Sequence, residues 1–321
     1  MKKTPIQFML LCFVQLALYG QSLEKVIVYN QNPYGLYGIA DKDSNNFFYQ
    51  KLVPKNKPIG VLVILPGGGD SIEDVMKQIS LHTFAVEKDI LVIFPSIYWS
   101  TDKCYPEIMF LDTIFRQIVE QYKVPKNRFI LGGLSGGGML SLVYAEKANM
   151  NVDSTFIKPA AVFGIDPPVD YANLYNRYKR DIERNFSKPA IWEGKMIIGS
   201  FNEAFGGSPE EFPENYVKYS IYSHSQKNGG NAQYLKNTPI RLYTEPGIIW
   251  QLEKRHRDLY DINCTDITAM INLLQLQGNN EAELIVTNDK GVRLNGEKHP
   301  HSWSIMDSEG CLVWILKQLN K

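Results

Sequence analysis

The sequence predicts an α/β protein in which helices cover both faces of a mainly parallel sheet. Short, wholly apolar runs of strand length recur along the chain, and amphipathic helical patterns separate them. Strands buried on both faces have this continuous apolar character, and parallel strands need a crossover connection between them. The third observation is the segment 129–144, in which an apolar run, a glycine-rich turn and a helical pattern follow one another.

The expected elements follow from apolar runs for strands and from apolar residues at helical spacing for helices. The expected strands are 25–29, 47–53, 60–65, 90–94, 129–131, 160–164, 196–199, 240–243 and 282–286. The expected helices are 71–87, 106–122, a helix from Ser135 through Tyr144, 265–277 and 307–319. Strands and helices therefore alternate along most of the chain, as in a doubly covered parallel sheet.

The segment 170–238 breaks this alternation. It is rich in aromatic and charged residues, and it becomes loop-like around 206–210 and 228–231. We expect an insertion after the strand at 160–164 that lies over the carboxyl edge of the sheet as a cap. Because the run 196–199 has the pattern of a core strand, we expect a lid on one domain rather than a separate domain.

Composition and charge restrict the class of partner. The chain has 321 residues, enough to bury a substantial core. Lys plus Arg and Asp plus Glu each number 34, so no overall electrostatic field favours nucleic acid or an anionic membrane. We therefore expect a single domain over 21–321 with no nucleic-acid partner. The sequence does not indicate the oligomeric state.

The first 20 residues have the pattern of an export signal peptide. Lys2 and Lys3 give a basic start, residues 8–18 form a short apolar stretch, and Gly20 is a small residue suited to cleavage. No other segment approaches the roughly 18 consecutive apolar residues that a membrane span needs. We therefore expect an exported protein, periplasmic or secreted, without a stable membrane span. The alternative is a retained anchor.

A candidate nucleophile lies in the turn Gly133-Leu134-Ser135-Gly136-Gly137. This is a G-x-S-x-G pattern placed between an expected strand and an expected helix, the context in which it forms a nucleophile elbow. The small neighbours allow strand and helix to approach closely, and the serine oxygen is presented at the carboxyl edge of the sheet. We predict that Ser135 is a catalytic nucleophile. The alternative is a glycine-rich turn without chemistry.

A candidate base follows the last expected strand. A serine hydroxyl needs a neighbouring base to accept its proton. His299 and His301 both lie on the loop between 282–286 and 307–319, where the base of a G-x-S-x-G enzyme is expected. We favour His301 over His299 because it directly precedes Ser302-Trp303 and the closing helix.

A candidate oxyanion hole lies near the same edge. Attack on a carbonyl builds negative charge on its oxygen, which backbone N–H groups must stabilise. Gly136 follows the nucleophile, and the loop Gly67-Gly68-Gly69 follows the strand 60–65. Glycine there lets the backbone approach a substrate closely. We predict donors at Gly136 and Gly68; a tight turn without this role is the alternative for the loop.

The loop Pro66–Gly69, the elbow 133–137 and the late His301-Ser302-Trp303 occur in the chain order of the α/β-hydrolase superfamily. Over residues 45–321 the chain most resembles its secreted bacterial esterases, of the feruloyl and acetyl-xylan esterase type. The resemblance implies an eight-stranded, mostly parallel sheet. It also implies a Ser–His–acid triad that requires no metal or organic cofactor.

The acid of the triad departs from the family pattern. The resemblance places an Asp or Glu just after the seventh strand, where this sequence has Gly247 at the most typical position. Glu245 is the nearest carboxylate and our first choice. The alternative is Asp166, after the strand at 160–164, because some members of the family take the acid from there.

Cysteine adds little to this account. Cys104, Cys264 and Cys311 remain after signal removal, and one disulfide with a free thiol or three buried thiols both fit. No C-x-x-C or His/Cys cluster has metal-ligand spacing, so we expect no structural zinc site.

The function we predict is an exported serine hydrolase that cleaves small-molecule or glycan-linked carboxylic esters through an acyl-enzyme. A peptidase of the same fold is one alternative. A non-catalytic binding protein that retains the fold is another, motivated by Gly247 at the acid position. The intact Ser135, His301 and glycine loop favour the enzyme.

Overall fold

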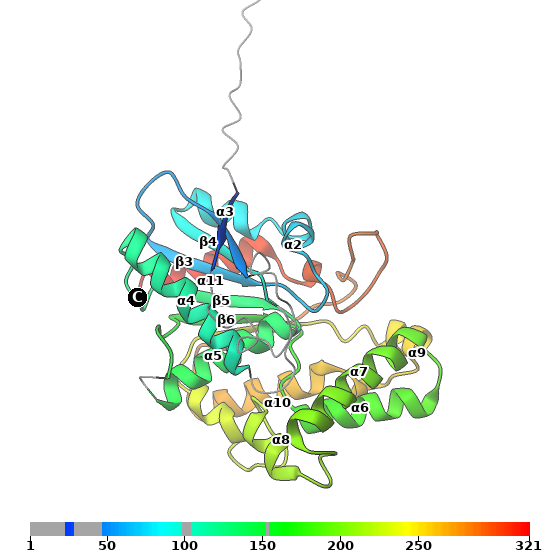
Figure 1. Cartoon of the computed structure of the whole chain (residues 1–321). Helices are drawn as coiled ribbons and strands as arrows, with labels where there is room; N and C mark the ends of the chain where they lie inside the picture. Colours follow the sequence, from blue (N-terminus) through cyan, green and yellow to red (C-terminus); the bar gives the residue numbers. More distant parts are fainter. Residues whose placement is uncertain (1–22, 29–46, 98–103, 152–153) are drawn as a thin grey trace, which may run out of the picture.

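The computed structural model describes residues 23–28, 47–97, 104–151 and 154–321 (Figure 1). Its eight described strands form one sheet in the order β1-β2-β4-β3-β5-β6-β7-β8. The pairs β1–β2 and β2–β4 are antiparallel, and every other neighbouring pair is parallel. The predicted α/β class with a mostly parallel eight-stranded sheet is therefore confirmed. The predicted signal, residues 1–20, lies outside the described residues.

The elements have the following bounds. The strands are β1 Glu24–Ile27, β2 Phe48–Leu52, β3 Gly60–Leu65, β4 Ile90–Pro95, β5 Phe129–Leu134, β6 Ala161–Ile165, β7 Ile240–Thr244 and β8 Ala282–Val286. The α-helices are α2 Ile72–Gln78, α3 Leu81–Glu87, α4 Tyr105–Tyr122, α5 Gly136–Met150, α6 Tyr171–Arg184, α7 Lys188–Phe205, α8 Pro213–Tyr219, α9 Ile248–Arg255, α10 Asn263–Leu276 and α11 Ser308–Leu319. Short 3-10 helices are η2 Gly230–Leu235, η3 Leu259–Asp261 and η4 Trp303–Ile305.

The central strands are apolar throughout because both faces of the sheet are covered. On β3, Val61 and Val63 belong to a core cluster with buried residues of α4, α5 and α10. Leu62 and Ile64, which point the other way, belong to a second cluster with residues of α3 and α11. Alternate residues of one strand thus contribute to two hydrophobic cores, one on each side of the sheet.

Two predicted elements differ in the structure. The run 196–199 is not a strand but part of α7, whose buried residues Ala190, Gly194, Phe201 and Phe205 recur at helical spacing. A short apolar run does not distinguish a strand from one turn of a helix, so the period of the longer segment decides. The predicted helix 71–87 is two helices, because Ile79 adopts an extended backbone conformation between α2 and α3.

The segment 170–238 is all helix and loop, and no strand occurs in it. Figure 1 shows α6, α7 and α8 grouped on the side of the sheet where α10 lies. An aromatic cluster joins these three helices. The ring of Phe201 lies 5.4 Å from that of Tyr171 and 5.2 Å from that of Phe205, and Phe205 lies 4.9 Å from Tyr216. These four aromatic residues therefore form the core of the insertion, whereas Trp192 on α7 is exposed.

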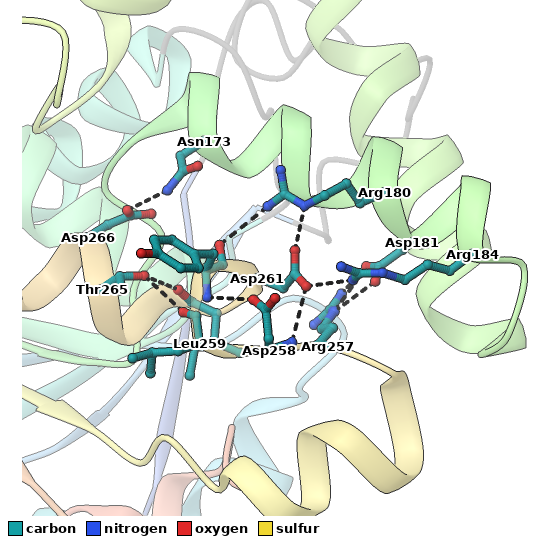
Figure 2. A network of polar contacts seen from close by, with 12 residues as sticks. Asn173, Arg180, Asp181, Arg184, Arg257, Asp258, Leu259, Asp261, Thr265 and Asp266 are labelled. Atoms are coloured by element: carbon teal, nitrogen blue, oxygen red, sulfur yellow. Dashed lines mark hydrogen bonds and ion pairs between the residues drawn. The ribbon is translucent and has the colours of Figure 1, made fainter.

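A buried ion-pair network ties this insertion to the segment before α10 (Figure 2). The Asp261 carboxylate is fully buried and accepts hydrogen bonds from Arg180 at 2.6 Å and Arg184 at 2.5 Å. Arg257 pairs with Asp181 beside it. Although burial opposes ionisation, the hydrogen bonds from the two arginines lower the pKa of Asp261. The network therefore fixes α6 against the chain that leads into α10.

None of the helices in the described ranges is long and apolar enough to cross a membrane. Cys264 on α10 and Cys311 on α11 are both buried, and no disulfide joins them. Burial raises the pKa of the Cys311 thiol to about 12. These two residues therefore act as small core side chains rather than as a covalent link.

Asp261→Asn should lower the free energy of unfolding by about 3 kcal/mol at neutral pH, because it leaves two arginines facing a neutral amide. The lowered pKa of Asp261 fixes the sign of the pH dependence. The difference from wild type should be complete above the unfolded pKa of Asp, about 3.9. It should vanish as pH falls through the lower folded pKa.

Urea unfolding at several pH values measures this difference. Asp289→Asn is the matched control, because its pair with Lys298 is exposed and should contribute less than about 1 kcal/mol. Equal unfolding midpoints for Asp261→Asn and wild type at pH 7 would contradict the role of the network.

Candidate active site

Ser135 occupies a sharp turn between β5 and α5. Its backbone has φ 54° and ψ −119°, a region that residues with a side chain rarely adopt. The Ser135 N–H donates to the Ile165 carbonyl at 2.8 Å, and the Ser135 carbonyl accepts from Met139 N–H at 2.9 Å. The neighbouring strand and the following helix therefore hold the strained residue in place, in the strand–turn–helix context that the sequence predicts.

Two glycines make this turn possible. A Cβ added to Gly133, or one added to Gly137, would lie 2.1 Å from the Leu65 carbonyl oxygen. That oxygen belongs to the backbone at the end of β3, so it cannot move aside as a flexible side chain could. The elbow is therefore packed directly against the end of β3, where the glycine loop begins.

His301 lies on the loop between β8 and η4, and its Nδ1 is 2.7 Å from Asp166 Oδ2. Asp166 directly follows β6, with φ 48°, and its N–H donates to the Tyr243 carbonyl at 2.7 Å. Since Nδ1 faces the carboxylate, the imidazole carries its proton there and leaves Nε2 as the acceptor for another group. The structure thus pairs His301 with Asp166, the alternative of our two carboxylates.

Two further residues hold Asp166 in place, one through its carboxylate and one through its backbone carbonyl. Thr244 Oγ1 donates to Asp166 Oδ1 at 2.8 Å, and Asn263 Nδ2 donates to the Asp166 carbonyl at 2.8 Å. Arg177 in turn donates to Asn263 Oδ1 at 2.8 Å. None of these residues was predicted from the sequence. Thr244 is adjacent to Glu245 at a strand end, but nothing local marks Asn263, which lies far from Asp166 in the sequence.

Glu245, our first choice for the acid, is not in contact with His301. Its carboxylate is buried and accepts from Thr287 Oγ1 at 2.9 Å, Lys290 N–H at 2.9 Å and Gly291 N–H at 3.0 Å. All three donors belong to the chain that follows β8. Glu245 therefore anchors the loop that carries His301 instead of touching the histidine itself.

Gly247 explains why no carboxylate stands at the usual position. It has φ 51° and precedes α9. A Cβ at this residue would lie 2.8 Å from Pro300 Cβ, one residue before His301. The histidine loop packs so closely here that a larger residue would displace it.

His299, the alternative base, has a different environment from His301. Its Nδ1 accepts the backbone N–H of His301 at 3.2 Å, and its ring lies 4.3 Å from that of Trp250. Burial, followed by the nearby charges of Arg293, His301 and Arg255, lowers the pKa of His299 to about 2. His299 is therefore neutral at physiological pH and supports the His301 backbone.

The glycine loop follows β3, with Gly67 buried and Gly68 and Gly69 exposed. In the described part of the chain, the N–H groups of Gly68 and Gly136 have no backbone acceptor. The Gly136 N–H is the first of α5, so the helix dipole adds to its positive character. Neither N–H group has a backbone partner among the described residues, and their role as an oxyanion hole stays a prediction.

Asp70 links the glycine loop to the histidine loop. It does not cap the next helix, because Ser71 is the N-cap of α2, where its hydroxyl accepts from Asp74 N–H at 3.1 Å. Asp70 Oδ2 instead accepts from Trp303 Nε1 at 2.9 Å, and Trp303 is completely buried. This contact connects the predicted oxyanion loop to the segment just after His301.

No group of three or more His, Cys, Asp or Glu that could hold a metal ion occurs among the described residues. The arrangement that does occur has a hydroxyl on a strained turn, an imidazole oriented by a carboxylate, and two backbone donors. Such a set can carry out acyl transfer by nucleophilic attack and proton transfer.

Comparison with known proteins gives structural but not sequence relatives. No protein-family model and no curated protein sequence matches this chain. An esterase/lipase from an uncultured bacterium aligns with a TM-score of 0.55 and 13% identity, over 94% of this chain and 85% of that chain. An S-formylglutathione hydrolase from Agrobacterium tumefaciens aligns with a TM-score of 0.51 and 12% identity, over 85% and 90%. The chain has the α/β-hydrolase fold.

A third similar structure is larger. An acylaminoacyl peptidase from Pyrococcus horikoshii aligns with a TM-score of 0.51 and 14% identity. The alignment covers 86% of this chain but 40% of the peptidase. At these identities the likeness establishes the α/β-hydrolase fold alone.

Gly133→Ala tests the packing of the elbow. The added methyl group would collide with the Leu65 carbonyl, so we expect the free energy of unfolding to fall by at least about 2 kcal/mol. Gly199→Ala is the matched control, since nothing lies within 4 Å of a Cβ at this position in α7. It should stabilise the protein by up to about 1 kcal/mol through helix propensity. Denaturant unfolding distinguishes the two, and equal midpoints would contradict the close approach.

Proposed function

We propose that the protein is a serine hydrolase that cleaves carboxylic esters through a triad of Ser135, His301 and Asp166. The observation that carries the proposal is the 2.7 Å contact between His301 Nδ1 and Asp166 Oδ2. Ser135 lies on a strained strand–helix turn, and its N–H donates to Ile165, the residue before Asp166. A carboxylate at Nδ1 fixes the tautomer in which Nε2 can accept a proton, and it stabilises the imidazolium that forms.

The chemical steps follow from these groups. Ser135 Oγ attacks the ester carbonyl while His301 Nε2 takes the hydroxyl proton. The negative charge on the carbonyl oxygen is stabilised by the N–H groups of Gly68 and Gly136. Collapse of the tetrahedral intermediate breaks the bond to the alcohol, which receives the proton from His301. A water activated by the same histidine then releases the acyl group and restores Ser135.

The alternative acid and the alternative functions have less support. The Glu245 carboxylate accepts hydrogen bonds from the chain after β8, so Asp166 is the acid in this proposal. The hypothesis of a non-catalytic binding protein rested on the lack of a carboxylate at Gly247. Asp166 contacts His301 from another strand end, so this lack no longer supports that hypothesis. A peptidase is the second candidate, because an acylaminoacyl peptidase is among the structurally similar proteins. The alignment covers only 40% of that peptidase, whereas it covers 85% of the esterase/lipase from an uncultured bacterium.

The substrate class and the location belong to the same proposal. The N-terminal pattern of Lys2, Lys3 and an apolar stretch supports export to the periplasm or beyond the cell. The resemblance to feruloyl and acetyl-xylan esterases supports small-molecule or glycan-linked esters as substrates. Neither a metal nor an organic cofactor takes part in the steps above.

Hydrolysis of p-nitrophenyl acetate by the mature protein tests the proposal. Ser135→Ala should lower kcat by roughly four orders of magnitude or more, because the nucleophile is lost. Ser200→Ala on α7 is the control and should retain the wild-type rate. Unchanged turnover in Ser135→Ala would place the nucleophile elsewhere, and activity confined to peptide substrates would refute the esterase assignment.

A further inference from the structure

A cavity of about 570 Å³ lies among α6, α8 and the start of α10, within the size range of small-molecule sites. Neither Ser135 nor His301 lines it. It is therefore separate from the residues of the proposed ester chemistry, and nothing in that chemistry uses it.

The charged side chains that line this cavity are mainly acidic. Its described lining includes the carboxylates of Asp170, Glu210 and Asp266 but no lysine or arginine. His224 is the one basic side chain there, and its hydrogen bond to Asp266 raises its pKa. When His224 and Asp266 form an ion pair, the exposed Glu210 still adds negative charge, while burial raises the pKa of Asp170.

The two buried carboxylates differ in how far their oxygens are satisfied. Asp170 accepts Asn173 N–H on Oδ1 at 3.0 Å and His224 N–H on Oδ2 at 2.9 Å, so both oxygens have donors. Asp266 accepts Asn173 Nδ2 at 2.7 Å and His224 Nε2 at 2.9 Å, both on Oδ1. Its Oδ2 has no hydrogen-bond partner among the described residues, and it is not one of their buried unpartnered atoms, so it is open to the cavity that Asp266 lines.

A carboxylate oxygen that faces a cavity without a protein donor is available to a hydrogen-bond donor of a ligand. The rest of the lining supplies apolar surface from Pro213, Tyr216 and Val217, together with the side-chain oxygens of Asn176 and Thr265 as acceptors. A ligand that fits this lining has a positively charged donor group and an apolar body. A primary ammonium provides three donors, and aromatic rings attract a cation further.

We propose that this cavity binds a primary ammonium compound with an apolar body, with the ammonium group on Asp266 Oδ2. The site does not depend on the proposed esterase activity. Ser135→Ala protein should therefore bind the amine with the affinity of wild type, and the two proposals stand or fall separately.

Calorimetric titration of the full protein with 2-phenylethylammonium chloride tests the site. We expect saturable binding that is at least tenfold tighter than binding of 2-phenylethanol, the neutral analogue of similar shape. Asp266→Asn should weaken the amine at least tenfold. Glu203→Gln on the exposed face of α7 is the control, because it removes a carboxylate that does not line the cavity.

Val217→Trp is a second variant that fills the cavity without altering Asp266, and it should abolish binding even if Asp266→Asn does not fold. Three results would each overturn the proposal. One is equal affinity for the amine and the alcohol. Another is the absence of saturable binding up to roughly 10 mM, equivalent to about −3 kcal/mol. The third is unchanged affinity in the folded cavity variants.

Discussion

Backbone hydrogen bonds between the ends of neighbouring parallel strands are the constraint on which this site depends. Ser135 N–H donates to Ile165 at the end of β6, and Asp166 N–H donates to Tyr243 at the end of β7. Each bond holds a residue with positive φ just beyond its strand, a conformation that isolated side-chain-bearing residues avoid. The parallel register therefore sets the spacing of the serine and the carboxylate. The histidine is then brought to them by a loop from the far end of the chain.

Three contacts bring that loop into place. Glu245 binds backbone N–H groups at 290 and 291, His299 accepts the His301 N–H, and Asp70 accepts from the Trp303 indole. On the other side, the chain of hydrogen bonds from Arg177 through Asn263 reaches Asp166. The inserted helix α6 is thus connected to the proposed triad acid. Asp266, in the separate amine cavity, lies one turn beyond Asn263 on the same helix.

Local sequence predicts some of these features and not others. The elbow around Ser135 is visible because strand, glycines and helix are contiguous, and the position of His301 after the last strand is equally local. The identity of the triad acid cannot be predicted in this way, because Glu245 and Asp166 both follow the carboxyl ends of neighbouring parallel strands, β7 and β6. The choice between them depends on where the loop after β8 runs, which no local pattern encodes. The strand predicted at 196–199 was wrong for a related reason. Four residues are too few to show a strand or helix period, and the packing of the whole segment makes it part of α7.

The most direct test of the account compares kcat for two variants with p-nitrophenyl acetate. Asp166→Asn should lower kcat by about four orders of magnitude, because the amide favours the wrong histidine tautomer. Glu245→Gln should leave kcat within roughly tenfold of wild type. It weakens the anchor of the loop that carries His301, and it leaves the Asp166 carboxylate that orients His301 unchanged. The reverse order of effects would contradict the assignment of Asp166 as the carboxylate that serves His301.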